Sequence, residues 1–431
     1  MRRAAPLHRL RQLASHLRAP VPSPSVASPL AARTFARSSS SSSASTSPPA
    51  RPWIFTTSAA FHGKPGYRAP PASAGLGADH PLVAWRDQAM REGKAPKEGA
   101  GHDWWFAEGI PESDGNGSKG VVLGVADGVG GWEESGVDPS HFSQSLMWFA
   151  RERVRTARWA LPPPSQAGEG DESGMALVDL LDGAYGDVMN EEGVVAGSST
   201  ACLVALDAET GMLHAANLGD SGFIVLRPQP ASDLPPTPPP SPPSDASTFT
   251  PPTPSVLYRL VHEQTPQIHF FNAPLQLSKL PAAERAQAEK AEKDGKWLRD
   301  LPRDADVVSL QLEDGDVVLL VTDGYSDNIW ADGETNRLVE LVRTKLDSEA
   351  AAAASKDGTS TSPSPSRPAS HAALASSIAQ TAVNFARVVS VRPDVYTPFA
   401  AEAKRWDVKG MVGGKVDDVT VVCAVVRRGE A

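Results

Sequence analysis

The chain has 431 residues, of which 40% are hydrophobic and 21% charged, a composition typical of a globular protein with a substantial buried core. The formal net charge of −10 is unevenly distributed, because the ten basic residues that precede the first acidic residue, Asp79, leave a body of net charge −20. This acidity argues against a nucleic-acid partner. No run of roughly 18 apolar residues occurs, which argues against a membrane span. The chain has only two cysteines, which argues against a disulfide scaffold.

The first 50 residues have the composition of an organellar transit peptide. They contain no Asp or Glu, and Leu7, Leu10, Leu13 and Leu17 recur at helical spacing, with arginines beside them and a Ser-rich stretch behind. We therefore expect a mitochondrial protein, most simply one of the matrix. A secretory signal needs an uninterrupted apolar stretch of roughly 7 to 15 residues, which arginines and polar residues interrupt here. A disordered basic tail is the remaining alternative.

A folded domain is expected from residue 101 to residue 427, after a linker at residues 51–100. Its predicted strands are apolar runs rich in Val, Ile and Leu: 121–126, 200–206, 213–218, 223–227, 256–260, 307–312, 317–322 and 420–426. Its predicted helices carry apolar residues at helical spacing: 141–156, 175–190, 334–345 and 372–389. Because strands arrive in groups rather than alternating with helices, the order favours an α+β fold with antiparallel sheets flanked by helices.

Two stretches of this domain break the pattern. Proline dominates residues 228–254, and Ala, Ser and Pro make up most of residues 350–370. Both stretches are too poor in large apolar side chains to pack against a core. They are predicted to be disordered surface insertions.

Three carboxylates are predicted to lie at or beside strand ends. Asp127 follows the run Val-Val-Leu-Gly-Val-Ala, Asp323 follows Val-Val-Leu-Leu-Val-Thr, and Asp417 precedes Asp-Val-Thr-Val-Val. A strand end holds a side chain at the rim of a rigid sheet, and oxygen-only ligands suit Mg²⁺ or Mn²⁺. A single Asp-Gly is more simply a turn, although Asp220, in Asn-Leu-Gly-Asp-Ser-Gly, adds a fourth candidate. Spacing alone leaves both interpretations open.

The sequence resembles the metal-dependent type 2C (PPM) protein phosphatases over nearly all of residues 101–426. Four segments carry the resemblance in the family's order: Ala126–Gly131 (ADGVGG), Ala216–Ser221 (ANLGDS), Thr322–Asp327 (TDGYSD) and Lys415–Thr420 (KVDDVT). The resemblance implies the type 2C fold, in which two antiparallel β-sheets pack as a sandwich flanked by helices. It also implies hydrolysis of phosphoserine and phosphothreonine in phosphoprotein substrates, by a water activated by two Mg²⁺ or Mn²⁺ ions.

The family's motifs imply a role for each matching residue. Asp127 matches the aspartate that bridges both ions, and the backbone carbonyl of Gly128 matches a further ligand. Asp323 and Asp417 match the remaining catalytic ligands. By its position in the closing motif, Asp417 rather than Asp418 is the ligand.

Three further aspartates match functional positions of the family. Asp103, in His-Asp-Trp-Trp-Phe, matches an early catalytic aspartate that orients the water nucleophile. Asp220 and Asp327 match positions that hold a weaker third ion in some members.

The chain departs from the family pattern at two positions. Many relatives carry a His directly after the first Asp-Gly, proposed as the general acid for the leaving alcohol, but this chain has Val129 there. Many relatives also have an Arg shortly before the early aspartate to bind the phosphate. Here the nearest cations are Lys94 and Lys97, either of which could bind phosphate as a point charge, although a surface lysine is the simpler interpretation.

A finer resemblance points to one branch of the family. Asp127–Trp132 (DGVGGW), Gln267–Leu277 (QIHFFNAPLQL), Thr397–Ala400 (TPFA) and Gly413–Asp418 (GGKVDD) resemble the mitochondrial phosphatases linked to coenzyme Q biosynthesis. This branch agrees with the transit-like N-terminus.

Two other functions are weighed against a phosphatase. A metal-binding pseudophosphatase that serves as a regulatory scaffold would be favoured by loss of a ligand position, whereas every acidic position is filled here. A binding module that uses the basic tail would lose its function if the tail were removed in the organelle. The sequence gives no indication of the oligomeric state.

Overall fold

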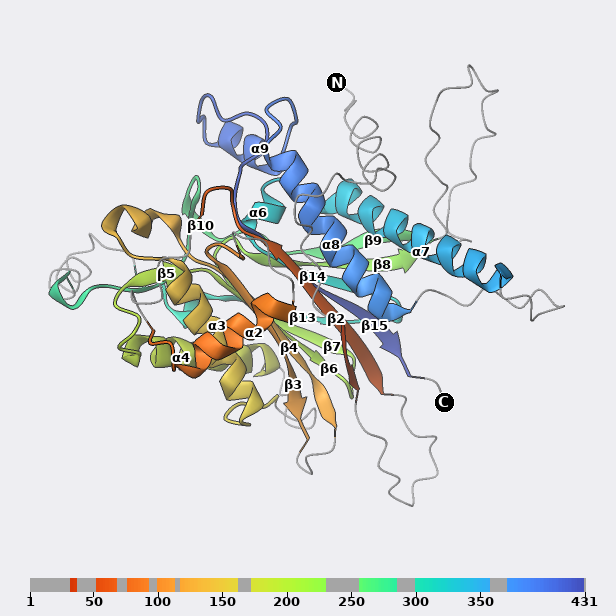
Figure 1. The fold of residues 1–431 in the computed structure, drawn as a ribbon, viewed down its shortest axis with the longest axis horizontal. Coiled ribbons are helices and arrows are strands. Elements are labelled where there is room, and N and C mark those ends of the chain that lie inside the picture. The colour runs from red at the N-terminus through yellow and green to blue at the C-terminus, as the bar shows by residue number, and fades with distance from the viewer. Residues whose placement is uncertain are drawn as a thin grey trace.

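Two antiparallel β-sheets form the centre of the molecule (Figure 1). The computed structural model describes residues 32–36, 52–67, 76–92, 99–112, 117–161, 172–229, 256–284, 299–356 and 370–429. The six-stranded sheet has the order β1 (Arg33–Ala36), β2 (Trp53–His62), β15 (Val419–Arg428), β14 (Val317–Val321), β8 (Gly222–Gln229) and β9 (Leu257–Glu263). The five-stranded sheet has the order β13 (Asp306–Gln311), β7 (Met212–Leu218), β6 (Ala201–Asp207), β4 (Ser118–Asp127) and β3 (Asp103–Pro111).

Smaller elements surround the two sheets. Short strands pair as β5 (Gly197–Ser199) with β12 (Leu277–Lys279) and as β10 (Ile268–Phe270) with β11 (Ala273–Pro274). The α-helices are α2 (Pro81–Glu92), α3 (Ser140–Arg155), α4 (Glu172–Asn190), α6 (Asp323–Ser326), α7 (Asn336–Lys356), α8 (His371–Ser390) and α9 (Pro398–Arg405). None of the helices in the described part of the chain is long and apolar enough to cross a membrane.

Strand β14 shows why the sandwich needs apolar residues on both strand faces. Its five residues are all buried. Val318 and Leu320 belong to the core between the two sheets, whereas Val317, Leu319 and Val321 belong to the core on the outer side of the six-stranded sheet. Successive strand residues point to opposite faces, so a run of five apolar residues is required when both faces are covered.

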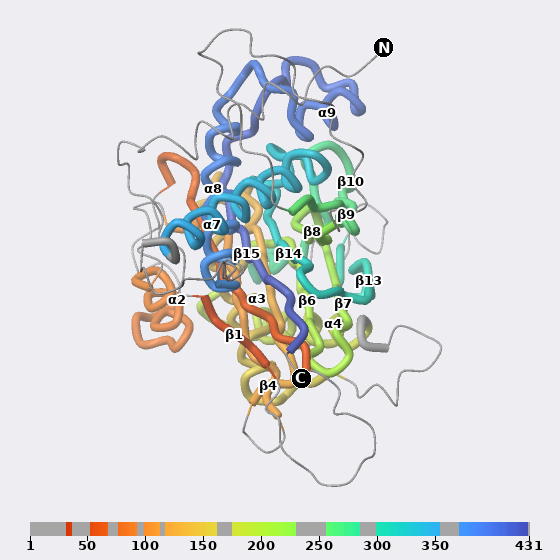
Figure 2. Tube along the Cα trace, turned by 90° about the vertical axis from the view of Figure 1, so that its right-hand side faces the viewer, coloured from red at the N-terminus to blue at the C-terminus, as the bar shows by residue number. Residues whose placement is uncertain are grey.

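Helices cover the outer face of each sheet. Helices α3 and α4 pack against the five-stranded sheet, and α8 packs across β2 and β15 of the six-stranded sheet, with α7 beside it. Figure 2 shows α7 and α8 together on one side of the strands. The result is an α+β sandwich flanked by helices, and the predicted fold class is confirmed.

All eight predicted strands and all four predicted helices occur, with shifted ends. The largest shift is in α7, which begins at Asn336 and continues to Lys356. The first part of the predicted insertion at 350–370 is therefore helical, and Ser370 is the N-cap of α8. Likewise, Pro228 and Gln229 belong to β8 rather than to the predicted insertion at 228–254. Residues 230–254 and 357–369 lie outside the described residues.

The prediction that the folded domain begins at residue 101 is wrong. Strand β2 lies within the supposed linker at 51–100 and pairs with β15 along ten residues. Its sequence includes Thr-Thr-Ser-Ala, whose small and hydroxyl side chains hide the apolar signal, although Phe55 and Phe61 are buried in the core. Residues 33–36, inside the predicted N-terminal tail, form the edge strand β1 beside β2. The other residues of the first 50, apart from Ala32, lie outside the described residues.

Candidate active site

The predicted catalytic aspartates meet at one end of the sandwich. Asp127 is the last residue of β4, Asp323 is the first residue of α6, two residues after the end of β14, and Asp417 lies two residues before the start of β15. Asp103 is the first residue of β3 and stands directly opposite Asp127 in the antiparallel register. The ends of β3, β4, β14 and β15 therefore bring these carboxylates together, including Asp103, whose strand was not predicted.

A buried hydroxyl links the two sheets at this point. Thr322 Oγ1 donates a hydrogen bond to Asp103 Oδ2 at 2.7 Å, and Thr420 N donates to Thr322 Oγ1 at 3.0 Å. Asp103 is fully buried. Its carboxylate is thus fixed by β14 and β15 of the opposite sheet.

The electrostatics of the cluster favour a bound cation. Burial raises the pKa values of Asp103, Asp127 and Asp323 well above the usual range, and the neighbouring carboxylates raise them further. Burial likewise raises the pKa of Asp220 to about 7. Asp220 Oδ1 and Asp323 Oδ1 are buried and have no hydrogen-bond partner among the described residues. Buried carboxylate oxygens without a donor suit a hard cation such as Mg²⁺ or Mn²⁺, so the donor set fits the predicted ions.

Lys415 was not predicted to belong to the site, yet its ammonium lies inside the cluster. It donates hydrogen bonds to Asp323 Oδ2 and to Asp327 Oδ2, the latter at 2.9 Å, and forms an ion pair with Asp417 Oδ2 at 3.2 Å. Burial opposes the charge of Lys415, but the three carboxylates raise its pKa well above the usual value. Within the described part of the chain, no group of three or more His, Cys, Asp or Glu side chains is arranged ready to hold a metal ion. The lysine partly accounts for this, because it takes up carboxylate oxygens that a metal would use.

Asp417 and Asp418 make different contacts. Asp417 Oδ2 faces Lys415. Asp418 is 1% exposed and accepts hydrogen bonds from two backbone N–H groups, of Lys64 to Oδ1 at 2.6 Å and of His102 to Oδ2 at 3.0 Å. Asp418 therefore ties the segments that precede β3 and follow β2 to the start of β15.

A second network lies beside the aspartates and was also missed. Lys64 Nζ is 4.0 Å from Asp417 Oδ1 and 3.3 Å from His102 Nδ1, and His102 Nε2 lies 2.8 Å from Glu133 Oε1. Lys64 follows β2, so treating that region as a linker concealed it. The predicted phosphate-binding candidates, Lys94 and Lys97, lie outside the described residues.

Gly128 occupies a position that admits no side chain. A Cβ atom there would lie 2.6 Å from the carbonyl oxygen of Pro139. Gly128 N donates to His102 O at 3.2 Å, and Val129 N donates to Ser198 O at 3.0 Å. The Asp-Gly pair thus leaves β4 along a fixed path, as a backbone ligand requires.

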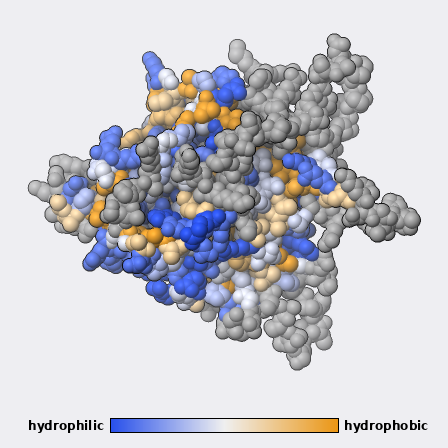
Figure 3. Space-filling model, in the orientation of Figure 1, coloured by the Kyte–Doolittle hydropathy of each residue, from blue (hydrophilic) through white to orange (hydrophobic). Residues whose placement is uncertain are grey.

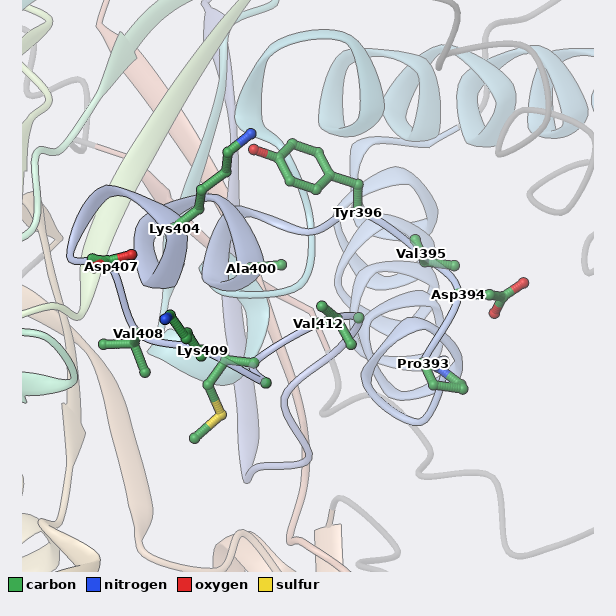
Figure 4. A pocket seen from close by; sticks show the side chains of 13 residues that line it. Pro393, Asp394, Val395, Tyr396, Ala400, Lys404, Asp407, Val408, Lys409 and Val412 are labelled. Atoms are coloured by element: carbon green, nitrogen blue, oxygen red, sulfur yellow. The ribbon is translucent and has the colours of Figure 1, made fainter.

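A pocket of about 460 Å³ lies in the connection between α8 and β15. Its lining includes Tyr396, Lys404, Lys409 and Val412 but none of the clustered aspartates. Figure 4 shows Lys404 and Tyr396 extending toward each other at one side of the opening, with Asp394 pointing outward. Apolar and polar surface alternate over α9 and its flanking loop in Figure 3. The pocket is distinct from the carboxylate cluster.

Comparison with known proteins identifies relatives of the chain, although it matches no protein-family model. The chain is 30% identical over 326 residues to the protein phosphatase PTC7 homolog fig of Drosophila willistoni, a match that covers 76% of this chain and 77% of that protein. It is 32% identical over 308 residues to the protein phosphatase PTC7 homolog of Xenopus laevis, covering 71% and 76% of the two chains. Among solved structures, it is similar to the photosystem II phosphatase PBCP, with a TM-score of 0.46 and 23% identity over 75% of this chain and 91% of that one.

Proposed function

Since the chain belongs to the PTC7 family of protein phosphatases, we propose that it hydrolyses phosphoserine and phosphothreonine in mitochondrial proteins with the help of two Mg²⁺ or Mn²⁺ ions. The observation that carries the proposal is the meeting of Asp103, Asp127, Asp323 and Asp417 at one end of the sandwich. When bound, the two ions would activate water and neutralise charge on the phosphoryl group.

The residues divide into ligands and a positioning group. Asp127, Asp323 and Asp417, with the carbonyl of Gly128, are proposed to hold the ions. The carboxylate of Asp103, anchored by the hydroxyl of Thr322, is proposed to accept a hydrogen bond from the attacking water and so orient it.

Lys64 takes the phosphate-binding role that the sequence offered to Lys94 and Lys97. Its side chain is 27% exposed, so substrate can reach it, and it stands beside Asp417 and Asp418. An ammonium is a point charge that can bind a phosphoryl oxygen without a fixed bidentate geometry. His102 and Glu133, behind it, hold it toward the site.

The leaving alcohol receives its proton from solvent in this proposal. The side chain of Val129 has no ionisable group that could donate a proton. Both ring nitrogens of His102 are engaged, one with Glu133 and the other with Lys64. The 1% exposure of His102 also keeps it from the substrate.

The mitochondrial location is supported by the composition of the first 50 residues and by the sequence resemblance, and the link to coenzyme Q biosynthesis by the resemblance alone. Sequencing the N-terminus of the mature protein from mitochondria tests the location. We expect removal of an N-terminal segment, and an intact Met1 or a secreted product would contradict it.

The experiment that tests the function compares turnover of phosphothreonine, phosphoserine and phosphotyrosine peptides with Mn²⁺. We expect hydrolysis of the first two, and a Lys64→Met variant with a raised KM for them. Lys119→Met, an exposed lysine at the start of β4, serves as the matched control and should match the wild type. Ion binding without any turnover would favour the regulatory scaffold instead.

A further inference from the structure

The ammonium of Lys415 lies among three carboxylates. It donates hydrogen bonds to Asp323 Oδ2 and Asp327 Oδ2 and forms an ion pair with Asp417 Oδ2 at 3.2 Å. The side chain is 16% exposed, and Nζ lies 5.6 Å from the centre of the Phe399 ring, which adds a cation–π contact. The charge is thus compensated on every side within the described part of the chain.

The backbone of Lys415 is fixed to the same turn that carries the carboxylates. Lys415 N donates to Asn328 Oδ1 at 3.0 Å, and Asn328 Nδ2 donates to Lys415 O at 2.9 Å. Asn328 is fully buried and also donates to Gly324 O at 2.9 Å. Because Asp323 and Asp327 lie on this turn, these hydrogen bonds hold the lysine beside two of its acceptors.

The two oxygens of Asp323 have different surroundings. Oδ2 accepts from Lys415, whereas Oδ1 is buried without a hydrogen-bond partner among the described residues. Lys415 makes no ion pair with Asp127. Its positive charge therefore lies against one oxygen of Asp323, while the other oxygen is an acceptor without a donor among the described residues.

We propose that the ammonium of Lys415 is a built-in cation that occupies the Asp323–Asp327–Asp417 side of the cluster in place of a third metal ion. It holds these carboxylates together when no metal is bound and lowers the affinity of this side for Mn²⁺. Asp220 and Asp327 match the positions that hold a third ion in some family members. Here their negative charges would instead stabilise the ammonium of Lys415. The inference rests on the proposed two-ion function and goes beyond it by assigning the third position.

The test measures metal binding and stability rather than turnover. The full chain and its Lys415→Gln and Lys409→Gln variants are freed of metal with chelator, and Mn²⁺ binding is followed by calorimetry and manganese content. Lys409 is an exposed lysine in the loop before β15 and controls for the loss of one positive charge. The melting temperature is recorded in chelator and in Mn²⁺.

We expect the wild type to bind two Mn²⁺ ions per chain. Lys415→Gln should bind an additional ion or bind Mn²⁺ at least about tenfold more tightly, since three carboxylates lose their internal counter-charge. Its melting temperature should fall in chelator, because the carboxylates repel one another, and recover in Mn²⁺. Lys409→Gln should match the wild type in all three measurements.

Two results would overturn the inference. One is an unchanged number and affinity of ions in Lys415→Gln. The other is a third ion in the wild type that Asp327→Asn removes, a result that stands even if Lys415→Gln fails to fold. If no variant bound Mn²⁺ at all, the two-ion function would itself be refuted, together with the role of Lys415.

Discussion

Asp103 and Asp127 stand directly opposite each other across β3 and β4. Directly opposed residues of an antiparallel pair project from the same face of a sheet. The face is the inner one, because Trp105, which pairs with Val125 on that face, stacks on Phe61 of β2 in the other sheet with ring centroids 4.4 Å apart. Two carboxylates are therefore held at the rim of the sandwich by backbone register, before any ion contributes.

Asparagine substitutions should separate the roles of Asp417 and Asp418. Asp417→Asn removes a charged ligand and should abolish most metal-dependent turnover without a large loss of stability. Asp418→Asn should retain more turnover but unfold at a lower temperature, because Asn offers one acceptor oxygen for two buried backbone N–H donors. An unpaired buried donor costs about 1–3 kcal/mol. Metal titration of turnover and thermal melts measure the two effects.

The opposite pattern would contradict this assignment. If Asp418→Asn lost all turnover at full stability while Asp417→Asn remained active, the ligand position would be one residue further along. Circular dichroism at the assay temperature confirms that each variant is folded.

A chain that begins at Asp79 should fail to fold. It lacks β2, which pairs with β15 along ten residues and buries Phe55 and Phe61. Losing one buried Phe side chain typically costs about 3–5 kcal/mol, and the whole stability of a domain is about 5–15 kcal/mol. A matched chain that begins at Ala32 keeps β1 and β2 and should unfold cooperatively. A cooperative melt of the shorter chain would show that β2 is dispensable.

The metal-free protein should lose stability through Asp220 as the pH rises. The pKa of this carboxyl is about 7 in the folded chain against 3.8 for an ordinary Asp, with burial as the main cause. A raised folded-state pKa means that the folded state prefers the protonated form, so stability is lost between these two values. Asp220→Asn removes this dependence. We therefore compare the melting temperatures of the variant and the wild type in chelator. The difference in favour of the variant should be larger at about pH 8 than at about pH 5. A difference that does not change with pH would contradict the prediction.

The sequence predicted the carboxylates better than their surroundings. Asp127, Asp323 and Asp417 flank long apolar strands, so the local pattern placed each beside a strand end, and only the family resemblance implied that they meet. Lys64 and Lys415 could not be found in this way, because a lysine in a loop has no local signal. Their contacts depend on which strand ends meet in space.

The missed strands have a related explanation. In β2, Thr-Thr-Ser-Ala interrupts the apolar pattern, and its burial depends on α8 and on the opposite sheet. The strand β3, which includes Trp104 and Trp105, was not among the predicted strands, and pairing with β4 gives it its strand geometry. Pairing with another strand therefore decided these elements, rather than intrinsic propensity.

The central claim is that the aspartate cluster catalyses hydrolysis by holding metal ions. Its most direct test is the turnover of a phosphothreonine peptide as a function of Mn²⁺ concentration, for chelator-treated wild type and Asp127→Asn. We predict no turnover in chelator, saturable recovery of the wild type with Mn²⁺, and a rate for folded Asp127→Asn that is lower by more than about a hundredfold. Undiminished turnover in chelator, or wild-type activity of Asp127→Asn, would contradict the account.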